Sequence, residues 1–160
     1  MLLGIVSDSH DHLANTRGAV RMLESLAVEL VIHCGDIGSA DIVSMFASWT
    51  THFVLGNVDY EGKLQSAIEA AGQTLHGRFG SLQLEGKRIA FLHGDNERQL
   101  NQAISDGQWD LVCHGHTHEA RCEHVGNTLV LNPGAIYRAH PLTIAVIELP
   151  SMEATSVPIC

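Results

Sequence analysis

Residues 2–10, with the sequence LLGIVSDSH, pass from a continuous apolar run into a polar cluster. The apolar run at residues 2–7 has the length of a strand, and its lack of alternation predicts burial on both faces, as in a parallel sheet. Asp8, Ser9 and His10 follow at the carboxyl end, where open α/β sheets bind their ligands. The run lacks a basic leading segment, so we expect a first strand rather than a signal peptide, and a cytoplasmic protein.

Strand-like and helix-like segments alternate through the first part of the chain. Apolar residues at Leu13, Val20 and Leu23, with arginines between them, give residues 13–26 a helical pattern. Such alternation implies right-handed crossovers and a parallel sheet. The expected strands are residues 2–7, 29–33 and 52–55, and the expected helices are residues 13–26, 40–48 and 61–71, the last closed by Gly72.

The later part of the chain favours hairpins. Glu85-Gly86 and Gly126-Asn127 are two-residue turn signals, each between two strand-like runs. We therefore expect an antiparallel second half and an α/β fold of two sheets packed face to face, with helices outside. The expected strands are residues 80–84, 87–92, 111–113, 121–125, 128–131, 142–149 and 154–159, with a helix at residues 97–105.

Length and composition narrow the class of protein. A chain of 160 residues is expected to form a single domain, residues 1–160. A hydrophobic content of 45% with 17% charged residues excludes intrinsic disorder. No apolar run has the length of a membrane span. The formal net charge of −9 disfavours anionic membranes and nucleic acids as partners.

The cysteines and histidines suggest different roles. Cys34, Cys113, Cys122 and Cys160 form no C-x-x-C pair, and we expect reduced, buried thiols. The eleven histidines outnumber the nine lysines and arginines together, and they stand beside eighteen acidic residues. Many histidines and acids with few basic residues indicate a metal site.

Five polar clusters each follow a strand-like run. Taken alone, most of them are typical of ordinary turns or structural histidines, but their joint order is not. If the five strands point the same way, the clusters meet at one rim. Imidazole and carboxylate suit zinc, manganese, iron or nickel, and a shared carboxylate can hold two cations about 3.5–4 Å apart. The clusters are Asp8-Ser9-His10, Gly35-Asp36, Gly56-Asn57-Val58-Asp59, His93-Gly94-Asp95 and Gly115-His116-Thr117-His118.

This ordered set resembles the calcineurin-like metallophosphoesterase superfamily, whose motifs run D-x-H, G-D, G-N-H-[D/E], H and G-H-x-H. The short chain and its opening, GIVSDSH at residues 4–10, look most like the small prokaryotic phosphodiesterase branch, the YfcE-like proteins. The resemblance spans residues 5–132. It implies a four-layer α/β/β/α sandwich with a dinuclear metal centre at the rim of the two sheets.

The resemblance also implies roles for individual residues. Seven ligands are implied: Asp8, His10 and His118 for the first ion, Asn57, His93 and His116 for the second, and Asp36 as the bridge. Among them Asp8, His10, Asp36, Asn57 and His93 are also the expected catalytic residues, and Asn57 positions phosphate as well. His12 and His140 lie outside the motifs and are candidates for the substrate cleft. His114 is expected to be a hydrogen-bonding neighbour, and His33, His52, His76 and His124 to be surface or structural residues.

One position departs from the family pattern. The family's G-N-H-[D/E] motif reads Gly56-Asn57-Val58-Asp59 in this chain. In the family that histidine is associated with the leaving group, which Val58 can neither protonate nor hydrogen-bond. The general acid is therefore unassigned. Asp59 itself lies outside the ligand set, and we expect it to hold a ligand or a histidine in place.

The resemblance implies hydrolysis of a small phosphoester. We expect the substrates to be diesters rather than monoesters. A metal-bridging hydroxide would attack phosphorus in line. Two divalent ions per chain are expected, manganese first, with zinc, iron, nickel or magnesium as alternatives. The rival reading is a catalytically weak protein-binding scaffold of the same fold, like a retromer subunit. We expect neither a membrane nor a sequence-specific nucleic acid as a partner. Exposed strands in the second half would allow two subunits to pair, so a homo-oligomer is an alternative to a monomer.

Overall fold

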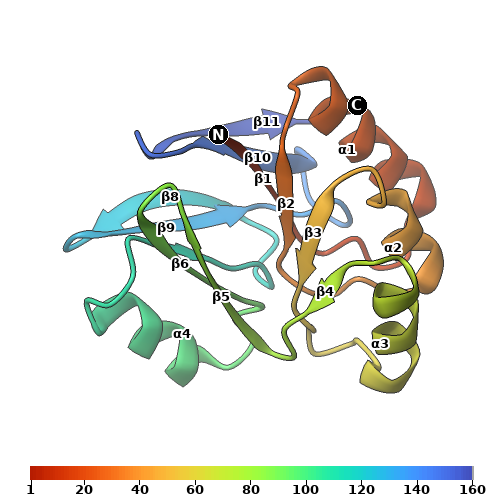
Figure 1. Ribbon diagram of the computed structural model, residues 1–160, viewed down its shortest axis with the longest axis horizontal. Coiled ribbons are helices and arrows are strands. Elements are labelled where there is room, and N and C mark those ends of the chain that lie inside the picture. Colours follow the sequence, from red (N-terminus) through yellow and green to blue (C-terminus); the bar gives the residue numbers. More distant parts are fainter. Residues whose placement is uncertain (160) are drawn as a thin grey trace.

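The computed structural model describes residues 1–159 and contains two sheets between outer helices (Figure 1). The first sheet holds β1 (Leu2–Val6), β2 (Leu30–His33), β3 (Thr50–Phe53), β4 (Thr74–Leu75), β10 (Thr143–Glu148) and β11 (Glu153–Pro158). The second holds β5 (Phe79–Leu84), β6 (Lys87–Leu92), β7 (Leu111–Cys113), β8 (Ala120–Val125) and β9 (Thr128–Pro133). The helices are α1 (Leu13–Ser25), α2 (Ala40–Met45), α3 (Glu61–Ala70) and α4 (Glu97–Ser105).

Three hydrophobic layers separate these elements. The first lies between the first sheet and helices α1 to α3, with Leu23 and Phe46 among its buried members. The second lies between the two sheets, where Ile5 of β1 and Phe91 of β6 belong to one cluster. The third joins the second sheet to Ile104 of α4. Figure 1 shows α1, α2 and α3 outside one sheet and α4 outside the other, so the four-layer α/β/β/α sandwich is confirmed.

Parallel pairing brings the ends of the central strands together. The order β11-β10-β1-β2-β3-β4 has β1, β2 and β3 parallel to one another, as their intervening helices predict. In the second sheet, with the order β5-β6-β7-β9-β8, strands β6, β7 and β9 are also parallel. The carboxyl ends of β1, β2, β3, β6 and β7 therefore carry the five polar clusters of the sequence.

The expected antiparallel second half is partly wrong. The hairpin β5–β6 is confirmed, and its turn residues Glu85 and Gly86 have φ of 49° and 76°, as a two-residue hairpin turn requires. The hairpin β8–β9 is confirmed as well. However, α4 connects β6 to β7 as a crossover, which makes that pair parallel. Strands β10 and β11 belong to the first sheet and not to the second, because β10 pairs antiparallel with β1 and β11 pairs with β10.

Smaller differences concern element ends and cysteines. Helix α2 ends at Met45 instead of residue 48, because the chain then turns so that the amide of Trp49 donates to the carbonyl of Phe46. The two-residue strand β4 was not predicted. Cys34 and Cys113 are buried, and burial raises the pKa of both thiols, but Cys122 is exposed on the edge strand β8, contrary to expectation. Cys160 lies outside the described residues.

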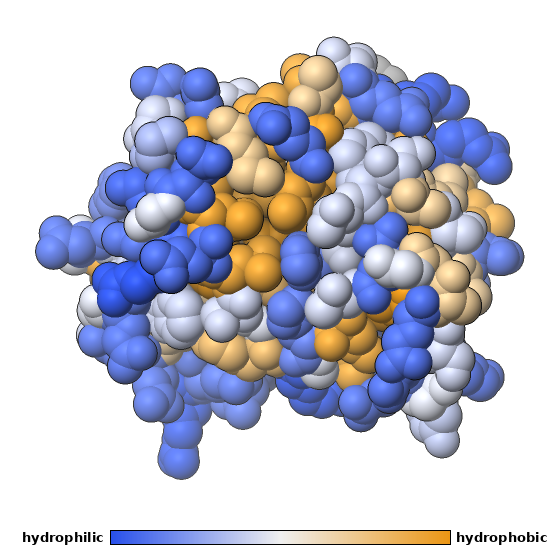
Figure 2. Space-filling view, in the orientation of Figure 1, coloured by the Kyte–Doolittle hydropathy of each residue, from blue (hydrophilic) through white to orange (hydrophobic). Residues whose placement is uncertain are grey.

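Hydrophilic side chains cover most of the face in Figure 2, and hydrophobic ones show in its middle. No helix within residues 1–159 combines the length and the apolar character that a membrane crossing needs.

Candidate metal centre

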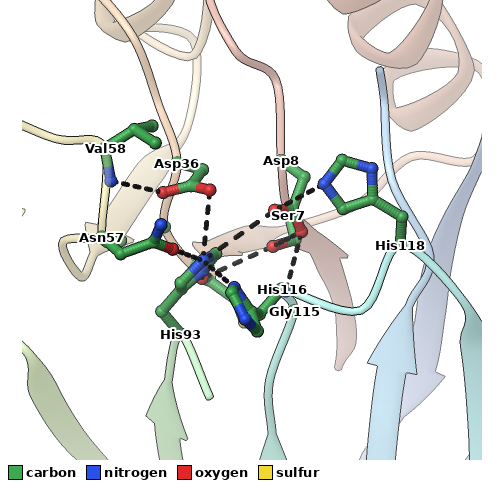
Figure 3. A network of polar contacts seen from close by, with 12 residues as sticks. Ser7, Asp8, Asp36, Asn57, Val58, His93, Gly115, His116 and His118 are labelled. Atoms are coloured by element: carbon green, nitrogen blue, oxygen red, sulfur yellow. Dashed lines mark hydrogen bonds and ion pairs between the residues drawn. The ribbon is translucent and has the colours of Figure 1, made fainter. Parts of the chain in front are cut away.

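Backbone hydrogen bonds tie the polar clusters to one another at the rim. The amide of Asp8 donates to the carbonyl of Gly35, and the amide of His10 donates to the carbonyl of Asp36, at 3.0 and 2.9 Å. The amide of Gly115 donates to the carbonyl of His93 at 2.9 Å. These bonds join loops within each sheet, and the His116 amide joins the two sheets by donating to Asp8 Oδ2 at 3.0 Å. Figure 3 shows side chains from both sheets pointing into a common space.

Six of the expected ligands form two groups. In each group, one ligand atom from each residue lies within 4.8 Å of the others. The groups draw on both sheets, so neither sheet alone contains the site. They are Asp8, His10 and His118, and Asp36, His93 and His116.

Asp36 lies between the two groups. Its Oδ2 is 3.3 Å from His10 Nε2 of the first group and 3.2 Å from His93 Nε2 of the second. Its Oδ1 accepts a hydrogen bond from the Val58 amide at 3.2 Å. One carboxylate oxygen therefore faces both groups while the other is held by the backbone, which is the arrangement that a bridging ligand needs.

Asn57 lies beside the second group. Its Oδ1 is 3.0 Å from His93 Nε2, and His116 Nδ1 is 3.2 Å from the same nitrogen. The three atoms converge although Asn57 is exposed and His93 is buried. A neutral amide oxygen and two imidazole nitrogens are suitable donors for a divalent transition metal.

Outer contacts fix which nitrogen of two histidines faces inward. His93 Nδ1 lies 2.8 Å from the carbonyl oxygen of Cys34, and His118 Nδ1 lies 3.3 Å from that of Arg138. A carbonyl only accepts, so each Nδ1 carries the proton and each Nε2 presents a lone pair. His118 Nε2 lies 3.2 Å from Asp8 Oδ1. Metal-binding histidines are oriented in this way by the group on their other nitrogen.

Two buried polar atoms in the first group have no hydrogen-bond partner within residues 1–159. They are Asp8 Oδ1 and His10 Nε2. The other oxygen of Asp8 is satisfied, because Ser7 Oγ and the His116 amide donate to it at 2.6 and 3.0 Å. A buried carboxylate oxygen without a partner is costly unless a cation satisfies it. The donor set therefore fits a bound divalent ion.

The charges at the site reinforce one another. Burial disfavours the ionised form of Asp8, but His10 and Ser7 outweigh it and lower the pKa of Asp8. Burial acts on Asp36 in the same way, and His93 lowers its pKa. The interaction with Asp8 raises the pKa of His10, and Asp36 overcomes burial to raise the pKa of His93. The carboxylates thus favour positive charge between them, and a divalent cation supplies it while the imidazoles stay neutral.

The backbone of the ligand loops is strained. Five of the expected ligands have φ in the left-handed region that favours glycine, between 44° and 70°. Such strain persists only where surrounding structure enforces it, and it clusters at functional sites. The five are Asp8, His10, Asp36, His116 and His118.

Two glycines in the motifs allow the loops to approach closely. A Cβ atom at Gly115 would lie 1.8 Å from Ser7 Oγ, and one at Gly56 would lie 2.0 Å from Asp36 Oδ1. Any side chain at either position would displace a ligand or the group that holds it.

Asp59 binds the backbone of two ligand loops. Its carboxylate accepts hydrogen bonds from the amides of Ile37, Gly38 and Gly56, at 2.8 to 3.1 Å. Burial raises the pKa of Asp59, although these amides act in the opposite direction. Asp59 thus joins the loop of Asp36 to the loop of Asn57.

We expect Asp59→Ala to lower the free energy of unfolding by about 1–3 kcal/mol, because the amides of the buried residues Ile37 and Gly56 lose their acceptor. Activity should fall about 10–100-fold as the ligand loops loosen. Urea unfolding and initial rates measure the two effects. Asp59→Asn keeps one acceptor oxygen and should lose less of both; equal losses in the two variants would contradict this role.

The structure separates the two substrate-cleft candidates. His12 caps α1, accepting a hydrogen bond from the Asn15 amide at 3.2 Å, and its ring stacks on Tyr137 at 5.4 Å. The Tyr137 ring lies 5.5 Å from that of His10, so His12 is at the edge of the site. His140 is exposed, and the structure does not bring it into either ligand group.

Asn132 was not singled out from the sequence. Its amide donates to the carbonyl of Gly115 and to Thr117 Oγ1, both at 3.0 Å, and so holds the Gly-His-x-His loop. A signal was present, because Asn132 follows the strand-like run 128–131 just as the other clusters follow theirs.

His114 is buried and belongs to neither group. Its Nδ1 lies 3.1 Å from the carbonyl oxygen of Gly115 and 3.4 Å from the Asn132 amide nitrogen, which confirms a hydrogen-bonding neighbour. We expect His114→Ala to keep both metal ions and most activity, whereas His116→Ala and His118→Ala each weaken one ion. Metal analysis of the purified variants tests this. Loss of metal from His114→Ala but not from His116→Ala would show that the ligand motif has been assigned two residues too late.

Comparison with known proteins gives a consistent result. A family model described as the calcineurin-like phosphoesterase superfamily domain matches residues 1–152. A phosphodiesterase of Methanocaldococcus jannaschii is 36% identical over 159 residues, which cover 96% of each chain. The solved structure of an archaeal phosphodiesterase covers both chains fully at 32% identity, with a TM-score of 0.91. The Escherichia coli phosphoesterase YfcE shares the fold at 21% identity, with full coverage and a TM-score of 0.72.

Proposed function

The chain belongs to the calcineurin-like phosphoesterase superfamily and is a metallophosphoesterase, and from this we propose that it hydrolyses small phosphodiesters with two divalent ions. The observation that carries the proposal is the position of Asp36 Oδ2, between His10 Nε2 and His93 Nε2 at 3.3 and 3.2 Å. A carboxylate oxygen shared by two groups of donors supports two adjacent ions better than a single one.

Preference for diesters is supported by similarity and by residue 58. The Methanocaldococcus jannaschii relative is itself a phosphodiesterase. Val58 stands where the family motif has a histidine, and the residue is 57% exposed. The variant motif sets this chain apart from superfamily members that use that histidine at the leaving group.

The chemistry divides between the ions and the chain. Bound metal ions would supply the Lewis acid and lower the pKa of the water that attacks phosphorus in line. Asp8, His10 and His118 would hold the first ion, Asn57, His93 and His116 the second, and Asp36 both. Asn57 is exposed beside His93 and can also position a phosphoryl oxygen through its amide N–H.

The donor set supports a first-row transition metal. Four imidazoles with two carboxylates and an amide suit manganese, our first expectation, as well as zinc, iron or nickel, and magnesium is the oxygen-favouring alternative. The scaffold reading loses support because each expected ligand position holds a competent donor. The cytoplasmic location and a homo-oligomer stay predictions.

A metal-by-substrate activity matrix on apo-protein tests the proposed function. Purified protein is stripped with chelator and reloaded with manganese, zinc, iron, nickel or magnesium. Each form is assayed with bis(p-nitrophenyl) phosphate, p-nitrophenyl phosphate and a cyclic nucleotide. We expect metal-dependent turnover, with the diester hydrolysed faster than the monoester. A faster monoester reaction with every metal would contradict the diester assignment.

A further inference from the structure

A cavity of about 280 Å³ lies beside the second ligand group. Its lining joins two expected ligands to Arg78, just before β5, to residues of the β6–α4 connection and to Gln99 of α4 (Figure 1). A diester bound at the ions has to place its ester groups in space next to the ligands, and this cavity provides such space. The polar side chains of its lining are those of Asn57, His93, Arg78, Asp95, Asn96 and Gln99.

Arg78 is the only arginine or lysine that lines this cavity within residues 1–159. Its Nη1 donates to the carbonyl oxygen of Gly56 at 3.3 Å, which holds the guanidinium next to Asn57. Arg88 and Arg121 pair with carboxylates, but Arg78 forms no ion pair within the described residues. A guanidinium keeps its charge at physiological pH, so an uncompensated cation lies beside the ligand loop.

The position of Arg78 matches what Val58 lacks. Residues 56–58 form one short loop, and Arg78 is bonded to its first residue. A departing alkoxide needs a proton or a nearby positive charge. Val58 offers neither, and a guanidinium offers charge and hydrogen bonds without giving up a proton.

We propose that this cavity binds the leaving group of the diester and that the Arg78 guanidinium offsets the charge on its departing oxygen. The proposal rests on the proposed phosphodiesterase function. Hydroxide derived from water forms the new P–O bond, and the P–O bond to the leaving group breaks. The electron pair stays on the departing oxygen, which takes up the proton that was released when water formed the hydroxide, so one water is consumed for each diester cleaved.

The cavity lining defines the chemistry of this leaving group. Asp95 disfavours a further phosphate, whereas its carboxylate can accept hydrogen bonds from hydroxyl groups. Asn96 Oδ1 accepts a hydrogen bond from the backbone N–H of Gln99 at 3.1 Å. The side-chain NH₂ group of Asn96 is therefore left to donate. The lining therefore suits a neutral alcohol with several hydroxyl groups, such as a sugar.

A second cavity shares one lining residue, Gln99, with the first. This second cavity has a volume of about 220 Å³, and its lining includes Phe79 and Trp109, with ring centroids 6.0 Å apart. Gln102 and Asp106 add polar groups to it. Aromatic rings with polar neighbours suit a planar heterocycle. The leaving group that fits both cavities is a nucleoside, with its sugar near Arg78 and its base near Trp109.

The test compares Arg78→Gln with Arg98→Gln in the metal-loaded enzyme. Arg98 is an exposed residue of α4 that lines neither cavity, and its substitution removes the same charge. For a dinucleoside monophosphate, whose leaving group is a nucleoside, we expect Arg78→Gln to lower kcat about 10–100-fold, somewhat less than loss of a buried oxyanion donor. For bis(p-nitrophenyl) phosphate the loss should stay below about threefold, because that leaving group needs little help. Added guanidinium should restore part of the lost rate with the nucleoside diester only.

The nucleoside assignment is tested with a matched substrate. A nucleoside glycerol phosphodiester cleaved at its glycerol oxygen presents a leaving group that cannot fill the aromatic cavity. Wild type should prefer the nucleoside leaving group about 3–10-fold in kcat/KM. Equal values would overturn that assignment.

The outcomes separate this proposal from the proposed function. Equal kcat in Arg78→Gln and Arg98→Gln, with wild type active, would overturn the role of Arg78 and leave the phosphodiesterase function standing. No metal-dependent turnover of any diester by wild type would remove the function itself. A loss in Arg78→Gln of the same size for both leaving groups would indicate a structural effect and would also overturn the proposal.

Discussion

Asp36→Asn is expected to remove nearly all activity while the fold persists. Asp36 is 3% exposed, and its Oδ1 accepts from the Val58 amide. An asparagine that keeps this bond must turn its NH₂ group toward His10 and His93, where the carboxylate oxygen lay (Figure 3 shows Asp36 between Val58 and His93). An NH₂ group cannot bind a cation, so both ions lose their shared ligand.

Turnover should fall by more than the factor of about 10–100 that is typical of substitutions outside the ligand shell. Metal analysis should show at least one ion missing, and circular dichroism should be unchanged. Asp41→Asn, on the exposed first turn of α2, is the matched control and should behave like wild type. An Asp36→Asn enzyme with near-normal turnover would show that the bridging ligand has been assigned wrongly.

The second large effect concerns the leaving group. Aryl oxides with a pKa of about 7 depart without protonation, whereas alkoxides need an acid or a strong positive charge. General acid catalysis contributes about 10²–10⁴-fold, and Val58 cannot supply it. We therefore expect rapid turnover of activated aryl diesters and a steep fall in rate as the pKa of the leaving group rises.

A rate series over leaving groups, run on wild type and on Val58→His, tests this expectation. Val58 is 57% exposed, so an imidazole at this position fits without repacking the core. The series should flatten in Val58→His, with the slow alkyl diesters gaining most. A series that is shallow in wild type and stays shallow in Arg78→Gln would mean that another acid is present. His12→Ala and His140→Ala would then identify it; His12 is the stronger candidate, because it stacks on Tyr137 next to His10.

The first half of the fold could be predicted because local patterns and the final pairing agree there. The run at residues 2–7 is buried as β1, and the helices that follow cross between parallel strands. In the second half the turns were predictable from Glu85-Gly86 and Gly126-Asn127. The parallel pairing of β6 with β7, and of β7 with β9, was not, since it depends on contacts far apart in sequence.

The site followed from strand ends and residue types. Asp8 and His93 lie far apart in the sequence, yet both follow a strand, and parallel strands bring such ends together. Asn132, Arg78 and the edge position of Cys122 were missed, because no motif includes them. Their positions depend on the fold: that of Asn132 on the pairing of β9 with β7, that of Arg78 on the connection from β4 to β5, and that of Cys122 on the place of β8 at a sheet edge.

The most direct test of the account is the number of metal ions per chain. Apo-protein is titrated with manganese and with zinc by calorimetry, and the loaded protein is analysed for metal after removal of free ions. We predict two ions per chain, and one or fewer in Asp36→Asn. A wild-type protein that binds no more than one ion under any loading condition would contradict the dinuclear centre.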